Sequence, residues 1–205
     1  MENEVSTSLE WATAGVALPG ETESGDLHVV KNFEGGVLAG LVDGLGHGPE
    51  AAAAARKAVA ALEEHPEETL IRLVRRCHER LKGTRGVVMS LASLDTRNNS
   101  VTWLGIGNVE GILVRERSQP GSRIHRIIGW GGVVGHKLPV LRPATIQLRE
   151  GDLLVFASDG IRQEFVERSD YRDQPQPVAE RICAQFGSRT DDALVLAIRY
   201  RGLNR

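Results

Sequence analysis

The segment that most limits how this chain can fold is VLAGLVDGLGHGPEAAAAA, residues 37 to 55. Its apolar first part predicts a buried strand, and Pro49 followed by an alanine-rich stretch predicts a helix. Between them, Asp43 comes directly before a short loop that contains three glycines. The segment therefore predicts a strand, a tight loop and a helix, with a carboxylate at the start of the loop.

This loop differs from an ordinary phosphate-binding loop by its carboxylate. Glycine-rich loops before a helix usually hold phosphate, because their backbone N–H groups approach the anion closely and the helix N-terminus is positive. Asp43 would repel such a ligand unless a cation lay between them. The loop thus raises the question of a bound metal ion.

Length and composition set further bounds. A chain of 205 residues can bury most of its apolar surface in one domain, so we expect a single domain over residues 1–205. A formal net charge of −2 favours neither nucleic acid nor a membrane surface as a partner. The sequence shows no signal peptide and no apolar run long enough to span a bilayer, so we expect a cytoplasmic protein. Its two cysteines should be reduced thiols.

The pattern of apolar residues predicts an α+β protein with largely antiparallel sheets. Helices are expected from Pro49 to residue 65, from Pro66 to near Gly83, and over residues 177–186. Residues 86–117 are expected to form a meander of three strands. The complete set of expected strands is 10–18, 27–34, 37–42, 86–95, 100–107, 110–117, 123–128, 144–149, 152–157 and 193–201. Because the strands do not alternate regularly with helices, antiparallel pairing is favoured.

Acidic residues stand at the ends of four expected strands. Asp26 comes just before the first strand of a hairpin and Asp43 just after the second, so antiparallel pairing puts them side by side. Asp159 ends a buried strand, and Asp191 and Asp192 precede the last one, so these ends share an edge if the two strands are antiparallel neighbours. Gathered carboxylates repel one another unless cations neutralise them, and an all-oxygen set favours Mg²⁺ or Mn²⁺. Two such ions about 3.5–4 Å apart can activate a water and hold a phosphoryl oxygen.

Each acidic motif taken alone has a simpler interpretation. An Asp-Gly pair after a strand is most often a solvated turn or a helix cap. The occurrence of SGD, VDGLGHG, ASDG and TDDA at four strand ends favours a metal site over four separate turns. Gly44 fits a metal site, because a backbone carbonyl can join a metal shell only where no side chain blocks the approach.

At these motifs the sequence resembles the metal-dependent protein serine/threonine phosphatases of the PPM type, also called the protein phosphatase 2C family. The DGLGHG form and the two final aspartates resemble the bacterial branch that acts on regulators of alternative sigma factors. Within it, the short chain is most similar to stressosome phosphatases of the RsbX type. The matching motifs follow the family's order: Ser24-Gly25-Asp26, Val42-Asp43-Gly44 with Gly46-His47-Gly48, Gly105-Ile106-Gly107-Asn108, Ser158-Asp159-Gly160 and Asp191-Asp192.

The resemblance implies an αββα sandwich, in which helices flank two antiparallel sheets and two Mn²⁺ or Mg²⁺ ions lie at one edge. It implies that Asp43 bridges both ions and that the Gly44 carbonyl completes one shell. It also implies that Asp159 and Asp191 bind the other ion. Asp26 would contribute through a metal or its water.

The sequence also departs from the family pattern. Many members place an arginine before the first acidic motif to bind phosphate, but residues 12–25 contain none. Phosphate binding would then fall to the metals, and intrinsic substrate affinity would be weak. The chain has little room for the flap of larger members, so specificity would come from docking a whole protein, with loop 129–137 as a candidate contact. The choice of Asp191 over Asp192 follows only the family's pairing of a ligand aspartate with a following Asn or Asp.

Two further residues have alternative interpretations. His47 is a candidate general acid that would protonate the leaving serine oxygen, and a solvent-facing histidine at a helix start is an equally good interpretation. Cys183 and Arg189 fit the C-x5-R pattern of cysteine phosphatases. That chemistry needs its cysteine at a strand end, whereas Cys183 falls inside an expected helix, so we disfavour it. For Trp103, core packing is favoured over a docking role.

Together these inferences predict a cytoplasmic phosphatase that hydrolyses phosphoserine or phosphothreonine with metal-activated water and no phosphoenzyme. By resemblance, its substrates would be phosphorylated stressosome scaffold proteins of the STAS-domain kind, and dephosphorylation would reset the stress response. A catalytically silent phosphoprotein-binding module of the same fold is the alternative from another class. The sequence does not set the oligomeric state, and a monomer is our expectation.

Overall fold

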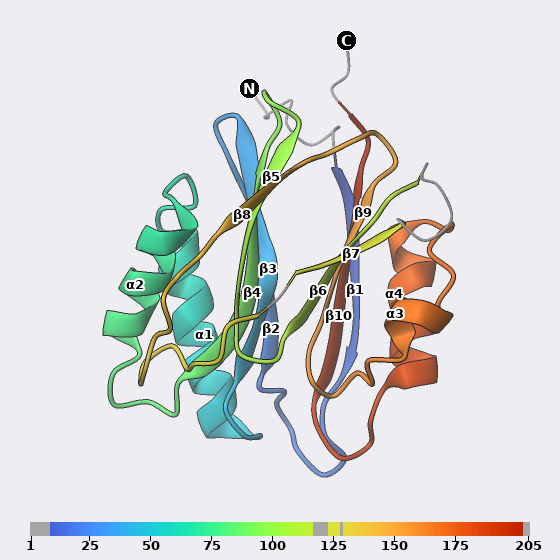
Figure 1. Ribbon diagram of the computed structural model, residues 1–205. Coiled ribbons are helices and arrows are strands. Elements are labelled where there is room, and N and C mark those ends of the chain that lie inside the picture. The colour runs from blue at the N-terminus through green and yellow to red at the C-terminus, as the bar shows by residue number, and fades with distance from the viewer. Residues whose placement is uncertain (1–8, 117–122, 128, 203–205) are drawn as a thin grey trace, which may run out of the picture.

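Two five-stranded sheets lie face to face in the computed structural model, which describes residues 9–116, 123–127 and 129–202 (Figure 1). All neighbouring strands within each sheet are antiparallel. Sheet A contains, in spatial order, β1 (Leu9–Val16), β10 (Ala193–Tyr200), β9 (Leu153–Ala157), β6 (Glu110–Val114) and β7 (Ile124–Ile127). Sheet B contains β2 (Asp26–Phe33), β3 (Gly36–Gly44), β4 (Val87–Asp95), β5 (Ser100–Ile106) and β8 (Ala144–Gln147).

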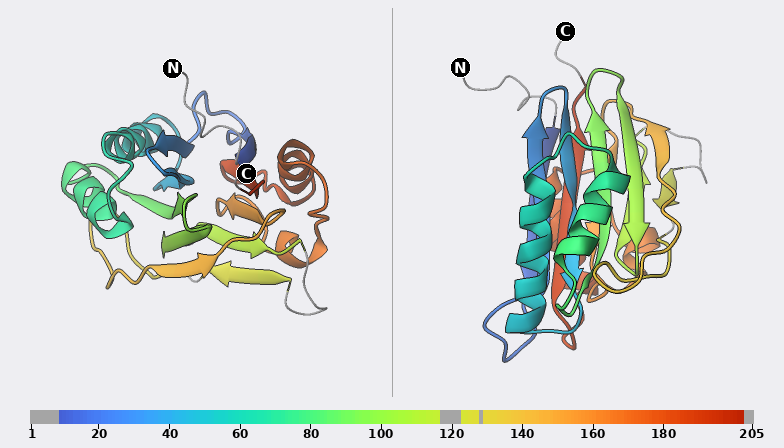
Figure 2. Two further views of the ribbon diagram at one scale, coloured as in Figure 1. Left: turned by 90° about the horizontal axis from the view of Figure 1, so that it is seen from above. Right: turned by 90° about the vertical axis from the view of Figure 1, so that its left-hand side faces the viewer.

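Helices cover the outer faces of both sheets, as the view from above shows (Figure 2). On sheet B lie α1 (Pro49–Glu63) and α2 (Leu70–Arg80), and on sheet A lie α3 (Phe165–Arg168) and α4 (Pro175–Phe186). This arrangement confirms the expected αββα sandwich of the α+β class. In the parts of the chain that the structure describes, none of the helices combines the length and the apolar character needed to cross a bilayer.

The core between the sheets is built around two aromatic rings. Trp103 of β5 is fully buried, and its ring lies 4.5 Å from that of Phe156 of β9, centroid to centroid. The indole N–H donates a hydrogen bond of 2.8 Å to Ser90 Oγ, which satisfies its one polar group inside the core. The preference for Trp103 as a core residue is therefore confirmed.

Helix α1 lies very close to the end of β3. Every residue of β3 is buried, and the buried face of α1 consists almost entirely of alanine. A Cβ atom on Gly44 would lie 2.2 Å from the backbone oxygen of Ala51, which no side chain could tolerate. The glycine and the alanine run together allow the start of the helix to pack against the loop that carries Asp43.

Two expectations about the elements were wrong. The predicted meander over 86–117 breaks after β5, because Gly107 takes a positive φ of 87° and the chain crosses into sheet A, where β6 pairs with β7 and β9. The second helix begins at Leu70 rather than at Pro66, because Thr69 keeps an extended backbone with φ −60° and ψ 144° and serves as the N-cap. The short helix α3 had no clear periodic signal.

Candidate metal centre

One edge of the sandwich collects acidic residues from both sheets. In sheet B, Asp26 and Asp43 are direct partners in the antiparallel register of β2 and β3, as their symmetric positions about the hairpin turn predict. Both side chains are buried, with exposed fractions of 6% and 9%. Two carboxylates thus lie side by side in a place where water cannot screen their charges.

Sheet A brings its own acidic residues to the same edge. Strands β9 and β10 are antiparallel neighbours, and Ala157 pairs with Val195. Asp159 follows the end of β9 and Asp191 precedes the start of β10, so both lie at the edge where the two strands meet. The two strands are therefore antiparallel neighbours, which is what the sequence analysis required for Asp159 and Asp191 to share an edge.

The pKa values of these carboxyl groups are raised, because the groups are buried and lie close to one another. Burial raises the pKa of Asp43 to about 9, and the charges of the other aspartates at this edge add to the effect. Burial also raises the pKa of Asp26 to about 7, with Asp192, Asp159 and Asp191 adding and a hydrogen bond from Ser158 opposing. The pKa of Asp159 is raised by partial desolvation and by the charge of Asp191. A group that disfavours its own ionisation in this way is poised to bind a cation.

The residues present fit a hard divalent cation. Oδ2 of Asp26 is buried and has no hydrogen-bond partner within the described ranges, so it is an oxygen ligand without a donor. Gly25 lies beside it, and a Cβ there would lie 3.3 Å from the carbonyl oxygen of Gly44, so a glycine keeps that carbonyl clear. Among residues 9–116, 123–127 and 129–202, no three acidic, His or Cys side chains lie close enough together to hold an ion by themselves. Mg²⁺ commonly takes one or two carboxylates and keeps several waters, so carbonyl oxygen and water would complete the shells.

The structure separates the roles of the two final aspartates. Both oxygens of Asp192 accept short hydrogen bonds from backbone amides, Oδ1 from Leu18 at 2.7 Å and Oδ2 from Gly25 at 2.6 Å. Asp192 is buried and fastens the β1–β2 connection to the start of β10. Asp191 is partly exposed, and one of its oxygens accepts a bond of 2.9 Å from the Asp192 amide. Of the pair, Asp191 has the freer carboxylate.

Asn108 is a site residue whose role the sequence did not assign. Its Nδ2 donates a hydrogen bond of 2.8 Å to Oδ2 of Asp159, across 51 residues of chain. The positive φ of Gly107 turns the chain at the end of β5 and brings Asn108 to the edge. An asparagine after a glycine at a strand end was the only signal in the sequence.

His47 lies in the glycine loop with its ring anchored by a second side chain. Nδ1 of His47 is 2.6 Å from Oε1 of Glu21, in the connection between β1 and β2. The histidine is exposed and Glu21 partly buried. The sequence reasoning named His47 but not Glu21, because nothing in a separation of 26 residues marks the pair.

An arginine does reach the glycine loop, although none precedes the first acidic motif. A Cβ on Gly46 would lie 2.8 Å from Nη1 of Arg85, which comes just before β4. The Nε of Arg85 donates a hydrogen bond of 2.6 Å to Glu50 in the first turn of α1. The sequence reasoning looked for this arginine only between residues 12 and 25.

The cysteine-phosphatase alternative lacks the local structure that it needs. Cys183 lies within α4 rather than at a strand end, and burial raises the pKa of its thiol. A thiol with a raised pKa is a poor nucleophile at neutral pH. The expected location of Cys183 inside a helix is confirmed.

Comparison with known proteins gives consistent relatives. Residues 34–201 match the family model of stage II sporulation protein E (SpoIIE). The phosphoserine phosphatase RsbX of Bacillus subtilis (strain 168) is 22% identical over 142 residues, which cover 69% of each chain.

Solved structures share the fold over nearly the full chain. A structure from work on the bacterial stressosome, described as a modular system adapted to control secondary messenger signalling, has a TM-score of 0.84 and 32% identity, over 93% of this chain and 99% of that one. RsbX in complex with magnesium has a TM-score of 0.82 and 19% identity, over 98% of each chain. The catalytic domain of the phosphatase PstP with two manganese ions has a TM-score of 0.72 and 17% identity, over 95% and 99%.

The family model covers residues 34–201, which is most of the chain. The chain therefore belongs to the SpoIIE family, within the PPM-type metal-dependent protein serine/threonine phosphatases of the sigma-factor-regulator branch.

Proposed function

We propose that this protein removes phosphate from phosphoserine or phosphothreonine of regulatory proteins in the cytoplasm, with two Mn²⁺ or Mg²⁺ ions at the acidic edge. The observation that carries the proposal is the convergence of Asp26 and Asp43 from one sheet with Asp159 and Asp191 from the other. When bound, such ions supply positive charge for the phosphoryl oxygens and lower the pKa of a water.

Each ligand has a defined structural support. Asp43 would bridge the ions from the end of β3, and the Gly44 carbonyl would complete one shell. Asp159 would bind with its orientation fixed by Asn108. Asp191 would bind an ion in preference to Asp192, because both carboxylate oxygens of Asp192 already accept hydrogen bonds from backbone amides. Ions held by aspartates from both sheets would supply positive charge for the substrate phosphate.

In this proposal, His47 would protonate the leaving oxygen of serine or threonine. Glu21 fixes its ring through a bond of 2.6 Å at Nδ1, which leaves Nε2 to face the substrate. A general acid matters for a poor leaving group such as an alkoxide and little for a good one such as nitrophenolate. We therefore expect His47→Gln to lower turnover of a phosphoserine peptide strongly and turnover of p-nitrophenyl phosphate little. Equal losses on both substrates would contradict the role.

The proposed substrates are phosphorylated stressosome proteins of the STAS-domain kind. Two findings support them: a 32% identical relative comes from work on the stressosome, and the relative RsbX is named a phosphoserine phosphatase. Dephosphorylation of such a scaffold would return the stress response to its resting state. No phosphoenzyme is expected, because water attacks the phosphorus directly.

A phosphate-release assay tests the activity. The protein is incubated with a phosphoserine peptide and with a phosphorylated STAS-domain protein, with Mn²⁺, with Mg²⁺ and with EDTA. We expect release that needs the metal and that is faster on the protein than on the peptide. Equal rates on both substrates would remove the substrate proposal and leave the phosphatase proposal intact.

Three variants separate the alternatives. Asp170→Asn is a control for loss of one carboxylate, because Asp170 is a surface residue paired with Arg172. We expect normal activity for it and none for Asp43→Asn. Activity that survives EDTA and disappears in Cys183→Ser would favour the thiol mechanism. Binding of the phosphopeptide without any hydrolysis would favour the silent binding module.

A further inference from the structure

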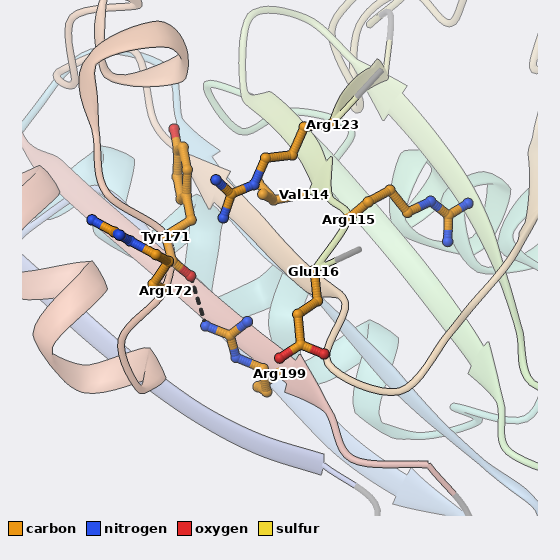
Figure 3. A pocket seen from close by; sticks show the side chains of 7 residues that line it. All are labelled: Val114, Arg115, Glu116, Arg123, Tyr171, Arg172 and Arg199. Carbon is orange, nitrogen blue, oxygen red and sulfur yellow. Dashed lines mark hydrogen bonds between the residues drawn. The ribbon is translucent and has the colours of Figure 1, made fainter. Parts of the chain in front are cut away.

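A polar pocket, seen from close by in Figure 3, lies at the end of sheet A where β10 ends. It has a volume of about 400 Å³, and we call it the arginine pocket, after Arg123 and Arg199, which line it together with Glu116 and Tyr171. Arg199 lies on β10, six residues beyond Ala193 at the acidic edge. At about 3.3 Å per residue, the two places are roughly 20 Å apart.

Arg199 brings a buried positive charge to this pocket. Only 6% of the residue is exposed, and its guanidinium donates to the carbonyl oxygens of Gly151 at 2.8 Å, Tyr171 at 2.8 Å and Asp173 at 2.5 Å. Carbonyl oxygens fix the group in place but do not neutralise it. A guanidinium has five N–H donors, so donors remain for a ligand.

Arg123 adds a second charge that faces the same space. Its guanidinium points into the pocket from the start of β7 (Figure 3). Within the described residues no carboxylate lies within 4.0 Å of either Arg123 or Arg199. Two arginines therefore face one cavity, although like charges repel and would separate if they served packing alone.

The remaining lining residues limit what can bind. Arg172 stands at the rim, and its charge is already paired with Asp170 at 2.6 Å. The hydroxyl of Tyr171 already donates a hydrogen bond of 2.6 Å to the backbone oxygen of Phe165. Glu116 points into the pocket beside Arg199 (Figure 3). A bare anion would be repelled by Glu116, whereas a ligand with a donor group beside its anion would satisfy it.

We propose that the arginine pocket binds a small phosphate ester, with Arg123 and Arg199 holding the phosphate and Glu116 accepting a hydrogen bond from a hydroxyl or amino group of the same molecule. Guanidinium groups match phosphate geometry and keep their charge at any physiological pH. The volume lies in the range of small-molecule sites and exceeds the size of a phosphate ion. This site is separate from the metal centre and does not depend on the proposed phosphatase activity.

Isothermal titration calorimetry tests the site on the full-length protein. AMP, O-phosphoserine and inorganic phosphate are titrated separately into the Mg²⁺-loaded protein and into protein in EDTA. We expect AMP and O-phosphoserine to bind in both conditions, with one ligand per chain in EDTA, and weaker binding of inorganic phosphate. Binding that disappears in EDTA would place the ligand at the metal centre and overturn the proposal.

Matched arginine variants locate the ligand. Arg123→Gln removes one pocket donor, and we expect at least about a tenfold loss of affinity, as for one charge-assisted hydrogen bond. Arg168→Gln removes the same charge from α3 outside the pocket, and we expect a change below about twofold. Both variants should melt within a few degrees of the wild type, because both side chains are exposed. Equal losses in both, or no binding at millimolar ligand, would show that the arginines are structural.

A further titration distinguishes two sources of the phosphate. A neutral peptide that carries one phosphoserine is compared with O-phosphoserine. Tighter binding of the free amino acid, lost in Arg123→Gln, supports a small phosphorylated metabolite as the ligand. Tighter binding of the peptide would overturn that source and assign the phosphate to a protein.

Discussion

Buried carboxylates occur in two different settings in this sandwich. Asp152, before β9, is 1% exposed and accepts hydrogen bonds from the guanidinium of Arg115 and, at 2.8 Å, from the amide of Arg149. Asp26 and Asp43 are almost as buried, but face each other without a cation. Among the residues that the structure describes, Arg115 provides a counter-ion for Asp152, and no basic side chain forms an ion pair with Asp26 or Asp43.

The difference shows how to distinguish structural from functional acidic residues. A buried ion pair completed within the chain costs desolvation but leaves no charge unmatched. A carboxylate pair without a partner is costly to fold, and it persists only where something from solution compensates for the cost. This contrast assigns Asp152 to the fold and supports the proposal that Asp26 and Asp43 form part of a site.

Replacement of Asp43 should have the largest effect on activity. We expect Asp43→Asn to lower Mn²⁺-dependent turnover at least about a thousandfold, because the bridging charge is lost. In EDTA the variant should be as stable as the wild type or more so, because it removes an unmatched buried charge. Phosphate release and chemical denaturation measure the two effects. A large loss of stability in Asp43→Asn would contradict the contrast between Asp43 and Asp152.

Replacement of Asp152 should lower stability and leave activity nearly unchanged, the opposite of what we expect for Asp43. Asp152→Asn leaves the Arg115 guanidinium buried without its carboxylate, and we expect a loss of about 3–5 kcal/mol in the free energy of unfolding. Activity per folded molecule should stay near normal. The double variant Arg115→Met, Asp152→Leu removes both charges and should recover most of the stability. Urea denaturation of the three proteins checks this, and an equally unstable double variant would count against the pairing.

The stability of the metal-free protein should depend on pH through the unpaired carboxyl groups of Asp26 and Asp43. The folded-state pKa values of Asp26 and Asp43, about 7 and about 9, lie above the unfolded value of 3.8. Their contribution to stability is therefore fully present below pH 4 and is lost as the pH rises towards 9. In EDTA, we expect the wild type to lose several kcal/mol of stability relative to Asp43→Asn over this range.

Thermal melts from pH 5 to pH 9, with EDTA and with Mn²⁺, measure this loss. The metal should stabilise the wild type more at pH 8 than at pH 5, because protons no longer compete for the carboxylates. A constant difference between wild type and Asp43→Asn across this range would show that the carboxylates ionise normally without metal.

A smaller effect is expected from the residue that orients Asp159. Asn108→Ala removes the hydrogen bond to Asp159 Oδ2, which also lowers the pKa of that carboxyl. We expect a loss of Mn²⁺ affinity of about 10- to 100-fold, as for other partners of metal ligands. The Mn²⁺ dependence of activity measures it. Asn98→Ala, in an exposed turn where Asn98 bonds Asp95, is the control and should change little.

The parts of the fold that the sequence could predict are those set by local pattern. The positions of Asp26 and Asp43 about a hairpin turn gave their register, and the apolar strand before Asp159 gave its place at a strand end. These inferences need only alternation and a turn.

What the sequence could not predict depends on contacts across long stretches of chain. Nothing local shows that β6 changes sheet after Gly107, because a turn of similar composition could have continued the meander. The bonds of Asp192 to Leu18 and Gly25 cross 174 and 167 residues, so only the folded chain distinguishes Asp192 from Asp191. Arg123 and Arg199 likewise line one pocket only in the folded chain, because β9 and β6 lie between β10 and β7 in the sheet.

The division of the acidic edge between two sheets has one more consequence. Among the described strands, none of sheet A is paired with any of sheet B, so the halves of the sandwich are joined by side-chain packing and by connecting loops. Ions held by Asp43 on one side and by Asp159 on the other would act as a removable cross-link between the halves. The two sheets could then not separate at this edge without releasing the ions, so a chelator that removed the ions would also remove the cross-link. Metal supply would set how long each molecule stays folded as well as how fast it works.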